Sequence, residues 1–243
     1  MGSIIEARAL SKTFGDREVI CDCNLSVRAG EIYGFLGANG AGKTTVLKLI
    51  CTLLRPTSGK IEVDGLNAVT YRRSVLMKIG SIIEVPVFYE HLSATENLRI
   101  HLAYLGLEGK ADIAETLERV GLPSTGSQKV ATFSLGMRQR LGIARAIIHK
   151  PKILLLDEPI NGLDPVGIRE VRELLLSLAH DDGVTVMISS HIISEIEHIA
   201  DTVGIIAGGS VIRETSMHAL RAESGGNFED YLINLMSGGV DNA

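Results

Sequence analysis

The residues with the clearest chemistry form a glycine-rich loop that ends in a lysine and two threonines. Residues 37–45 read Gly-Ala-Asn-Gly-Ala-Gly-Lys-Thr-Thr, which fits the spacing G-x-x-x-x-G-K-[ST] in full. Glycines let the backbone curl until several N–H groups point at phosphate oxygens, and Lys43 adds a positive charge. The Thr44 hydroxyl is an oxygen ligand for Mg²⁺. Because a strand-like run precedes the loop and a helix-like run follows it, the pattern predicts a nucleotide triphosphate site rather than a chance glycine turn.

Two carboxylates follow an apolar run farther along the chain. Residues 153–156 are Ile-Leu-Leu-Leu, and Asp157 and Glu158 come next. Ligands of open α/β sheets bind at the carboxyl ends of the strands, so we expect both side chains beside the phosphates. Asp157 would hold Mg²⁺, and Glu158 would orient and polarise the attacking water as a general base. Such a pair is often only a loop charge or a helix cap, and the phosphate loop upstream favours the catalytic role.

A histidine follows a second apolar run. His191 comes directly after residues 184–190, Val-Thr-Val-Met-Ile-Ser-Ser. It either caps the next helix or, at the end of a neighbouring strand, donates a hydrogen bond to the γ-phosphate.

The elements that must position these residues alternate between strand and helix, which favours a mostly parallel sheet. Residues 4–27 differ, since they predict short strands around a turn at residues 15–16 and hence an antiparallel β-lobe. Ser93 and Glu96 have the spacing of a capping box, so a helix begins there. Three helices without an intervening strand are expected, over 93–105, over 112–120, and from Ser134 to before Pro151, and they predict a helical lobe.

The remaining runs complete one domain. A helix is expected over 43–54, with Leu53 available for the core, and strands over 31–36, 60–64 and 78–83. After the helical lobe we expect strands at 153–156 and 184–189, helices at 166–179 and 192–200, and a hairpin around residues 208–209. The predicted parts are a β-lobe over 1–30 with part of 55–70, a core over 31–84 and 151–215, a helical lobe over 85–150, and a tail over 216–243 with one or two short helices and a frayed end at 237–243.

Composition excludes several classes of protein. The 243 residues are 45% hydrophobic and carry a formal net charge of −5 with no block of Lys or Arg, which argues against nucleic-acid binding. The apolar runs fall far below the roughly 20 residues that span a bilayer, and no secretory signal is seen, so a cytosolic chain is expected. Cys21, Cys23 and Cys51 are expected to be ordinary reduced thiols, because an odd count in a long chain does not fit a disulfide framework.

Over nearly its whole length the chain resembles ABC transporter ATPase subunits. Besides the phosphate loop, residues 133–140, Phe-Ser-Leu-Gly-Met-Arg-Gln-Arg, resemble the family signature, and Leu-Leu-Asp-Glu-Pro at 155–159 resembles its Walker B segment. Residues 161–164, Asn-Gly-Leu-Asp, look like the D-loop, His191 looks like the switch histidine, and Phe14 lies where the family places an aromatic that stacks on adenine. The resemblance implies a P-loop NTPase with a mostly parallel sheet, an N-terminal antiparallel β-lobe and an inserted helical lobe.

The family mechanism implies two copies that face each other head to tail in an ATP-dependent homodimer. One copy would hold ATP with the loop, and the other would contact it in trans with Ser134 and Gly136. The catalytic residues implied are Glu158, His191, Lys43 and Glu84, and the Mg²⁺ ligands are Thr44, Glu84 and Asp157. The residues implied to bind ATP are Phe14, Gly37, Asn39, Gly40, Ala41, Gly42, Lys43, Thr44, Thr45, Ser134, Gly136 and Asp164. The partners implied are integral membrane permease subunits, which place the chain at the cytoplasmic face of the membrane.

The chain departs from the family pattern in three places. Leu135 and Met137 replace a small and a polar residue of the signature, and Ile160 stands where the family commonly has Thr. Glu84 ends the strand where the family usually has Gln. A carboxylate binds Mg²⁺ more strongly than an amide but repels phosphate, so Glu84 either holds the metal and alters coupling to the permease or is a solvated loop charge.

Glu84 together with Ser-Leu-Gly-Met at 134–137 resembles the ATPases of bacitracin-resistance and lantibiotic-immunity exporters. The predicted function is therefore an ATPase that powers export of, or immunity to, antimicrobial peptides. One alternative is a peptide-sensing signalling complex, and another is a soluble ABC ATPase that acts on ribosomes or DNA. The surface that docks the permease is expected within 85–96, with Phe88 and Tyr89 as candidate contacts, although two aromatic residues there can equally belong to the local core.

Overall fold

A four-stranded antiparallel sheet forms the N-terminal part of the computed structural model, which describes residues 2–225 and 227–236. Its strand order is β2-β1-β4-β5, formed by β2 (Arg17–Arg28), β1 (Ser3–Phe14), β4 (Ser58–Val63) and β5 (Leu66–Asn67). The turn at Gly15 and Asp16 joins β1 to β2, and Gly15 takes a φ of +56° that a hairpin turn requires. The antiparallel β-lobe is thus confirmed, although β1 and β2, with 12 residues each, are longer than the short strands expected.

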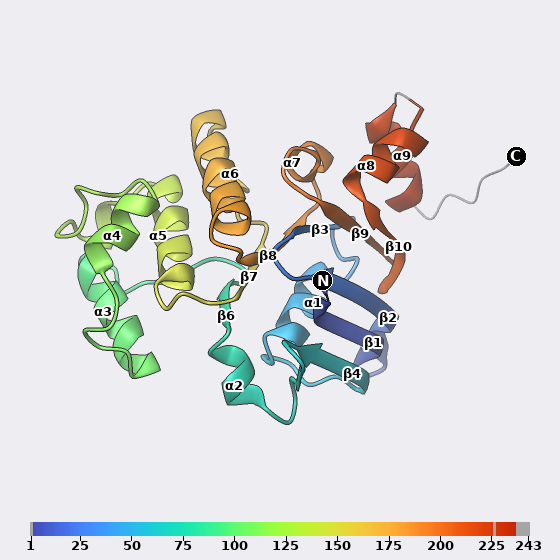
Figure 1. Ribbon diagram of the computed structural model, residues 1–243, viewed down its shortest axis with the longest axis horizontal. Coiled ribbons are helices and arrows are strands. Elements are labelled where there is room, and N and C mark those ends of the chain that lie inside the picture. The colour runs from blue at the N-terminus through green and yellow to red at the C-terminus, as the bar shows by residue number, and fades with distance from the viewer. Residues whose placement is uncertain (1, 226, 237–243) are drawn as a thin grey trace, which may run out of the picture.

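A six-stranded sheet carries the centre of the molecule (Figure 1). Its order is β10-β9-β3-β8-β7-β6, and every neighbouring pair is parallel except β10 with β9. Strands β3, β7 and β8 are buried along their whole length, as expected of the central strands of a parallel sheet that is covered on both faces. The strands are β3 (Ile32–Leu36), β6 (Ile79–Ile82), β7 (Ile153–Asp157), β8 (Thr185–Ser190), β9 (Thr202–Ala207) and β10 (Ser210–Ser216).

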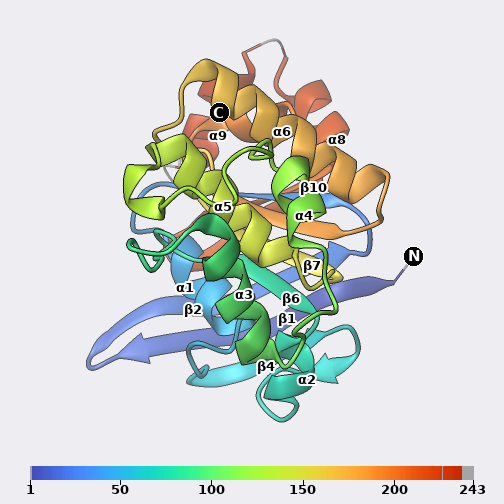
Figure 2. The same cartoon turned by 90° about the vertical axis from the view of Figure 1, so that its left-hand side faces the viewer.

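Helices α3 (Ala94–Leu105), α4 (Ile113–Arg119) and α5 (Leu135–Ile147) lie together at one end of the molecule and face the viewer in Figure 2. Each begins close to the residue expected to start it, and each has a side-chain cap. Ser93 and Glu96 form a complete capping box, the Asp112 side chain accepts from the Glu115 N–H, and the Ser134 side chain accepts from the Met137 N–H. The inserted helical lobe is therefore confirmed, with a short 3₁₀ turn, Val130–Thr132, leading into α5.

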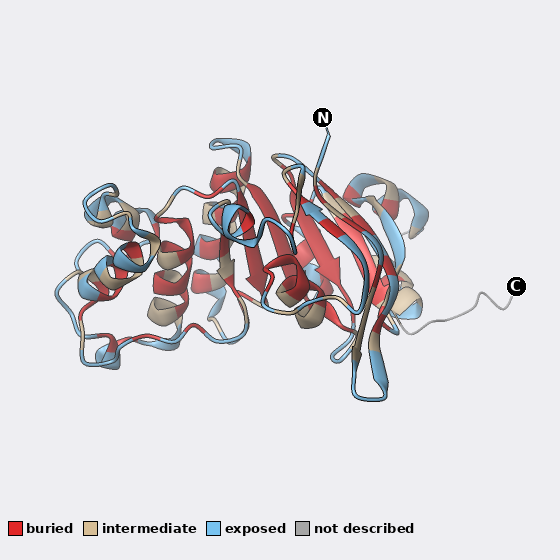
Figure 3. Ribbon diagram, turned by 90° about the horizontal axis from the view of Figure 1, so that it is seen from below, coloured by how far each residue is buried: buried red, intermediate tan, exposed pale blue. Residues whose placement is uncertain are grey.

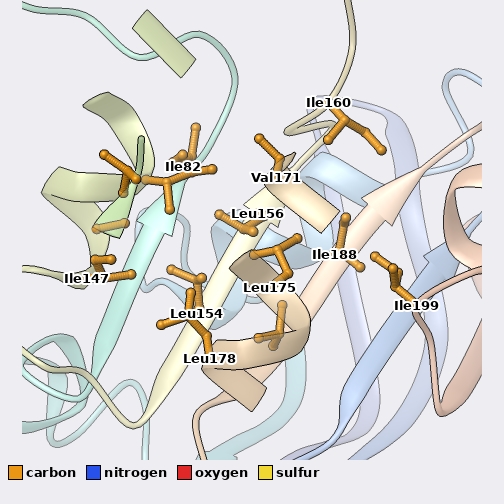
Figure 4. Close-up of a cluster of buried hydrophobic side chains, with 14 of the residues drawn as sticks. Ile82, Ile147, Leu154, Leu156, Ile160, Val171, Leu175, Leu178, Ile188 and Ile199 are labelled. Carbon is orange, nitrogen blue, oxygen red and sulfur yellow. The ribbon is translucent and has the colours of Figure 1, made fainter. Parts of the chain in front are cut away.

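The other helices cover the faces of the six-stranded sheet. They are α1 (Lys43–Ile50), α2 (Arg72–Leu76), α6 (Pro165–His180), α7 (Ile193–Glu197), α8 (Met217–Glu223) and α9 (Phe228–Met236). On one face Leu154 and Leu156 of β7 meet Val171, Leu175 and other apolar residues of α6 (Figure 4). On the other face, residues of β3 and β7 meet the apolar side of α1. The central strands are accordingly the most buried part of the fold (Figure 3).

Some expectations about elements were wrong. Helix α1 ends at Ile50 rather than at residue 54, because Thr52 takes a φ of +55° and turns the chain out of the helix. Leu53 is consequently exposed and not part of the core. Helix α2 and strand β5 were not expected. The frayed end expected at 237–243 lies outside the described residues. Among the described helices, none is both long and apolar enough to cross a membrane.

Candidate functional site

The glycine-rich loop joins β3 to α1 and leads directly into the helix. Gly42 caps α1 with a φ of +111°, a conformation that side chains rarely adopt, and a Cβ there would lie 2.6 Å from Ile20 Cδ1. Lys43 is the first helical residue and is only 6% exposed. Its Nζ donates a hydrogen bond to the Gly37 carbonyl at 2.6 Å and lies 3.5 Å from Glu158 Oε1. The loop therefore presents backbone N–H groups and one cation at the positive end of a helix.

Asp157 at the end of β7 is held by two hydroxyl groups. Thr44 Oγ1 donates to Asp157 Oδ2 at 2.7 Å, and Ser189 Oγ donates to Asp157 Oδ1 at 2.6 Å. The second contact follows from sheet register, because Asp157 and Ser189 are paired residues of the parallel strands β7 and β8. Sequence reasoning missed Ser189. The structure thus brings the loop, the end of β7 and the end of β8 to one point.

Glu158 leaves the strand in a strained backbone conformation. Its φ is +51°, which costs a non-glycine residue on the order of 1–3 kcal/mol. The Glu158 N–H donates to Ser189 Oγ at 3.1 Å, and Glu158 Oε2 lies 2.8 Å from His191 Nδ1. The carboxylate is therefore fixed between an imidazole and the Lys43 ammonium, which suits a group that positions a water molecule.

The two serines at the end of β8 point to different carboxylates. Ser190 Oγ donates to Glu195 Oε2 on α7 at 2.7 Å, away from the loop. Burial raises the pKa of Glu195, while the hydrogen bond from Ser190 acts in the opposite direction. Ser189 and Ser190 are both fully buried, so they form a matched pair that differs in the carboxylate each one holds.

Thr44 and Asp157 offer a donor set that fits Mg²⁺. Both supply oxygen, the ligand type that this ion prefers, and the Thr44 Oγ1 and Asp157 Oδ2 atoms are already neighbours. Glu84 differs from them. Its carboxylate is mostly exposed and pairs with Lys48 Nζ of α1 at 2.6 Å, and its backbone φ is +61°. The Glu84 carboxylate is thus joined to Lys48 rather than to Thr44 or Asp157.

A cavity of about 370 Å³ opens over the loop. Two residues of its lining were not expected, Arg17 and Val19 of β2. They enter because β2 lies against the loop, where a Cβ added at Gly42 would lie 3.4 Å from the Val19 carbonyl oxygen. Phe14 is outside the lining, although it pairs with Arg17 across the hairpin, and its half-exposed ring carries Lys12 Nζ at 4.9 Å from the centroid. The lining residues are Arg17, Val19, Asn39, Gly40, Gly42, Lys43, Thr44, Thr45 and Glu158.

The signature residues and Asp164 of the D-loop lie outside that cavity. Ser134 caps α5, and Asp164 caps α6 by accepting from the Gly167 N–H at 2.9 Å. Leu135, which replaces a small residue of the signature, packs close to Gly162. A Cβ added at Gly162 would lie 3.0 Å from Leu135 Cδ2. Leu135 therefore packs against the 161–164 loop while remaining half exposed.

The two aromatic residues of 85–89 differ in exposure, which decides between the core and the surface for each of them. Phe88 is only 8% exposed and carries the Arg145 guanidinium 4.9 Å from its ring centroid, so it belongs to the core and cannot be a docking contact. Tyr89 remains exposed.

Comparisons with known proteins agree with this geometry. The sequence pattern of the family described as ABC transporter matches residues 20–161. The bacitracin transport ATP-binding protein BcrA of Bacillus licheniformis is 49% identical over 221 residues, which are 91% of this chain and 72% of that protein. The lantibiotic transport ATP-binding protein SrtF of Streptococcus pyogenes is 44% identical over 211 residues, which are 87% of this chain and 90% of that protein.

Comparison with solved structures also finds ATP-binding cassettes of ABC transporters. The dimeric structure of a post-hydrolysis state of the ATP-binding cassette MJ0796, bound to ADP and Pi, matches with a TM-score of 0.78 at 26% identity, over 88% of this chain and 98% of that one. The resemblance read from the motifs and the fold class are thereby confirmed. The chain belongs to the ABC transporter family, in which it is an ATP-binding subunit that hydrolyses ATP.

Proposed function

We propose that this chain hydrolyses ATP with Mg²⁺ to drive membrane permease subunits that export, or give immunity to, antimicrobial peptides of the bacitracin or lantibiotic type. The observation that carries the proposal is the meeting of Thr44, Asp157 and Glu158 at the positive end of α1. The names of the relatives BcrA and SrtF support the peptide class. The division into a core over 31–84 and 151–215 and a helical lobe over 85–150 is part of the proposal.

Each side chain has a defined task in this reaction. The loop residues Gly37 to Thr45 would bind the phosphates, and Lys43 would leave the Gly37 carbonyl and Glu158 to meet the β- and γ-phosphate oxygens. Thr44 and Asp157 would hold Mg²⁺, which neutralises phosphate charge when bound. Glu84 would join them only by leaving Lys48.

Glu158 acts on the attacking water. Its carboxylate accepts the water's proton or orients the water, and His191 fixes the other carboxylate oxygen and can turn to the γ-phosphate. The strained backbone of Glu158 keeps the carboxylate at the end of β7, directly beside Asp157. Phe14 would stack on the adenine from the edge of the hairpin.

A second copy completes the site. Ser134 and Gly136 lie outside the chain's own cavity, at the N-terminal end of α5, where backbone N–H groups favour an anion. In a head-to-tail homodimer they would contact the partner's ATP, with Asp164 beside the interface. The dimeric cassette found among the solved structures supports this arrangement.

The permease would dock on the exposed residues that follow β6. Val85, Val87 and Tyr89 are 74%, 78% and 47% exposed, an unusual row of apolar side chains for a free surface. Docking there would hold the chain at the cytoplasmic face of the membrane. A peptide-sensing complex would use the same contacts with the permease. Transport of the peptide across the membrane therefore distinguishes an exporter from a sensing complex.

Two experiments test the proposal. Glu158→Gln is expected to lower the rate of ATP hydrolysis on the order of a hundredfold or more while ATP binding persists, so that MgATP shifts the variant to a dimer in size-exclusion chromatography. A normal rate in this variant would remove Glu158 from the mechanism.

The peptide class is tested in the host. Deletion of the gene is expected to sensitise cells to bacitracin or to lantibiotics, and the wild-type gene but not Lys43→Ala is expected to restore survival. Unchanged survival across both classes would exclude these substrates. Sensitisation without efflux of a labelled peptide would favour the sensing complex.

A further inference from the structure

Two positive side chains line the cavity over the glycine-rich loop. Lys43 belongs to the loop itself, and Arg17 reaches the cavity from β2. The third charged residue of the lining is Glu158, whose Oε1 atom lies 3.5 Å from Lys43 Nζ. The charges of Lys43 and Glu158 offset each other, so Arg17 gives the lining its net positive charge. A nucleotide that brings several negative charges into the cavity is therefore attracted by Arg17 as well as by the loop.

Arg17 lies between the edge of the hairpin and the start of α1. It pairs with Phe14 in the antiparallel ladder of β1 and β2, and paired residues share one face of a sheet. Val19, two residues farther along β2, lines the same cavity, and its carbonyl oxygen would lie 3.4 Å from a Cβ added at Gly42. Arg17 is thus placed between Phe14, which is proposed to stack on adenine, and the end of the glycine-rich loop.

The Arg17 guanidinium is not committed to a carboxylate of its own subunit. The side chain is exposed, and the ion pairs among residues 2–225 and 227–236 do not include it. Arg213, in contrast, is paired with Glu223. An arginine without such a partner keeps its N–H donors for an incoming anion.

The position of Arg17 selects one part of the nucleotide. Lys43 and the loop N–H groups would take the β- and γ-phosphates, and Phe14 would take the adenine. Between these two ends a nucleotide has a neutral ribose and an α-phosphate, and only the α-phosphate is charged. A guanidinium presents parallel N–H donors that match the geometry of phosphate oxygens, so the α-phosphate is the group that suits Arg17.

We propose that Arg17 binds the α-phosphate of the nucleotide, so that the β-hairpin and the glycine-rich loop hold it from two sides. This inference rests on the proposed function, because it assumes that the cavity binds an adenine nucleotide with the base at Phe14. ATP and ADP have the same α-phosphate, so the contact stabilises the bound substrate and the bound product alike. Such a contact lowers KM and Kd without accelerating the chemical step.

The test measures the binding of ADP, AMP and adenosine to the full-length chain by displacement of a fluorescent ADP analogue. These three ligands lack a γ-phosphate, so binding is observed without hydrolysis. In Arg17→Gln the Kd of ADP and the Kd of AMP are each expected to rise about tenfold, as for the loss of one charge-assisted hydrogen bond. The Kd of adenosine, which has no phosphate, is expected to stay within about twofold of the wild-type value. Arg17→Lys keeps the charge but not the planar fork, so a rise of about threefold is expected for ADP and AMP.

Arg28→Gln is the matched control. Arg17 and Arg28 are the first and last residues of β2 and are both exposed, so the two variants remove the same charge from the same strand. They lie roughly 35 Å apart along the strand, well beyond the Debye length of about 10 Å at 0.1 M salt. Arg28→Gln is therefore expected to bind all three ligands as the wild type does. In steady-state hydrolysis, Arg17→Gln should raise KM for MgATP about tenfold and leave kcat within about twofold.

The three ligands also separate the results that would contradict the inference. Unchanged Kd values for ADP and AMP in Arg17→Gln would overturn it and leave the proposed function standing. A rise for ADP without a rise for AMP would overturn it by assigning the cation to the β-phosphate. An equal rise for adenosine would overturn it too, because a loss that does not depend on phosphate indicates a distorted hairpin. Failure of the wild-type chain to bind ADP would overturn the proposed function, and the inference with it.

Discussion

Removing the Ser189 hydroxyl tests whether the site depends on the support given to Asp157. In Ser189→Ala the carboxylate of a nearly buried aspartate loses a short hydrogen bond from a buried donor. A hydrogen bond to a charged group contributes about 1.5–3 kcal/mol. The Glu158 N–H keeps a second acceptor, the Ser189 carbonyl at 3.2 Å, so its loss adds little. We expect the free energy of unfolding to fall by about 2 kcal/mol, or Tm by about 4–8 °C for a chain of this size.

The neighbouring serine separates stability from catalysis. Ser190→Ala removes a bond of similar length to another buried carboxylate, that of Glu195, so a similar loss of stability is expected. Only Ser189→Ala should lower kcat/KM for MgATP, by about tenfold, because only Asp157 is proposed to hold the metal. The assays are urea unfolding and steady-state ATP hydrolysis of both variants.

Two results would refute this reasoning. Equal losses of kcat/KM in Ser189→Ala and Ser190→Ala would show that general loosening of the sheet edge, not support of Asp157, controls the rate. An unchanged free energy of unfolding in Ser189→Ala would show that the hydroxyl contributes nothing to holding the carboxylate.

The remaining predictions concern the helical lobe and its contact with the sheet. Burial lowers the pKa of His101 to about 4 and also lowers that of His149, so the folded protein binds fewer protons than the unfolded chain as pH falls below 6.5. The free energy of unfolding should therefore decrease from pH 6.5 towards 4, and His101→Leu should flatten this decrease in urea titrations. If the free energy of unfolding of His101→Leu fell with pH as steeply as that of the wild type, His101 would not be the group responsible. Gly80→Ala would place a Cβ 2.0 Å from the Ala146 carbonyl oxygen, and about 2 kcal/mol of destabilisation is expected. Wild-type unfolding in this variant would mean that α5 can move away from β6 freely.

The parts of the site that lie close together in the sequence were predictable. The phosphate loop needs glycines, a lysine and a hydroxyl at fixed spacing, so the sequence of residues 37–45 is sufficient to predict it. The caps Ser93, Asp112 and Ser134 are equally local, since each side chain bonds an N–H three residues later.

Long-range partners were not predictable in the same way. Ser189 bonds Asp157 only because β8 pairs with β7 in one register, and a serine at a strand end gives no sign of this. The sequence could not place Phe88 in the core or on the surface, because an aromatic residue can face either side of an extended segment. In the structure its ring is buried and lies under the Arg145 guanidinium. Helix α2 has only five residues, too few for a recognisable apolar period.

The order of strands in the central sheet also governs when the protein can fold during synthesis. Strand β3 ends at residue 36, yet its two neighbours, β8 and β9, begin at residues 185 and 202. At roughly 5–20 residues per second, a ribosome needs on the order of ten seconds or more to produce that interval. Until then, the four buried side chains of β3, those of Ile32, Tyr33, Phe35 and Leu36, and the main chain of this strand have no partner in the sheet. A nascent chain stopped before β8 would carry the complete glycine-rich loop with no scaffold to hold it, and it would be a natural client for chaperones.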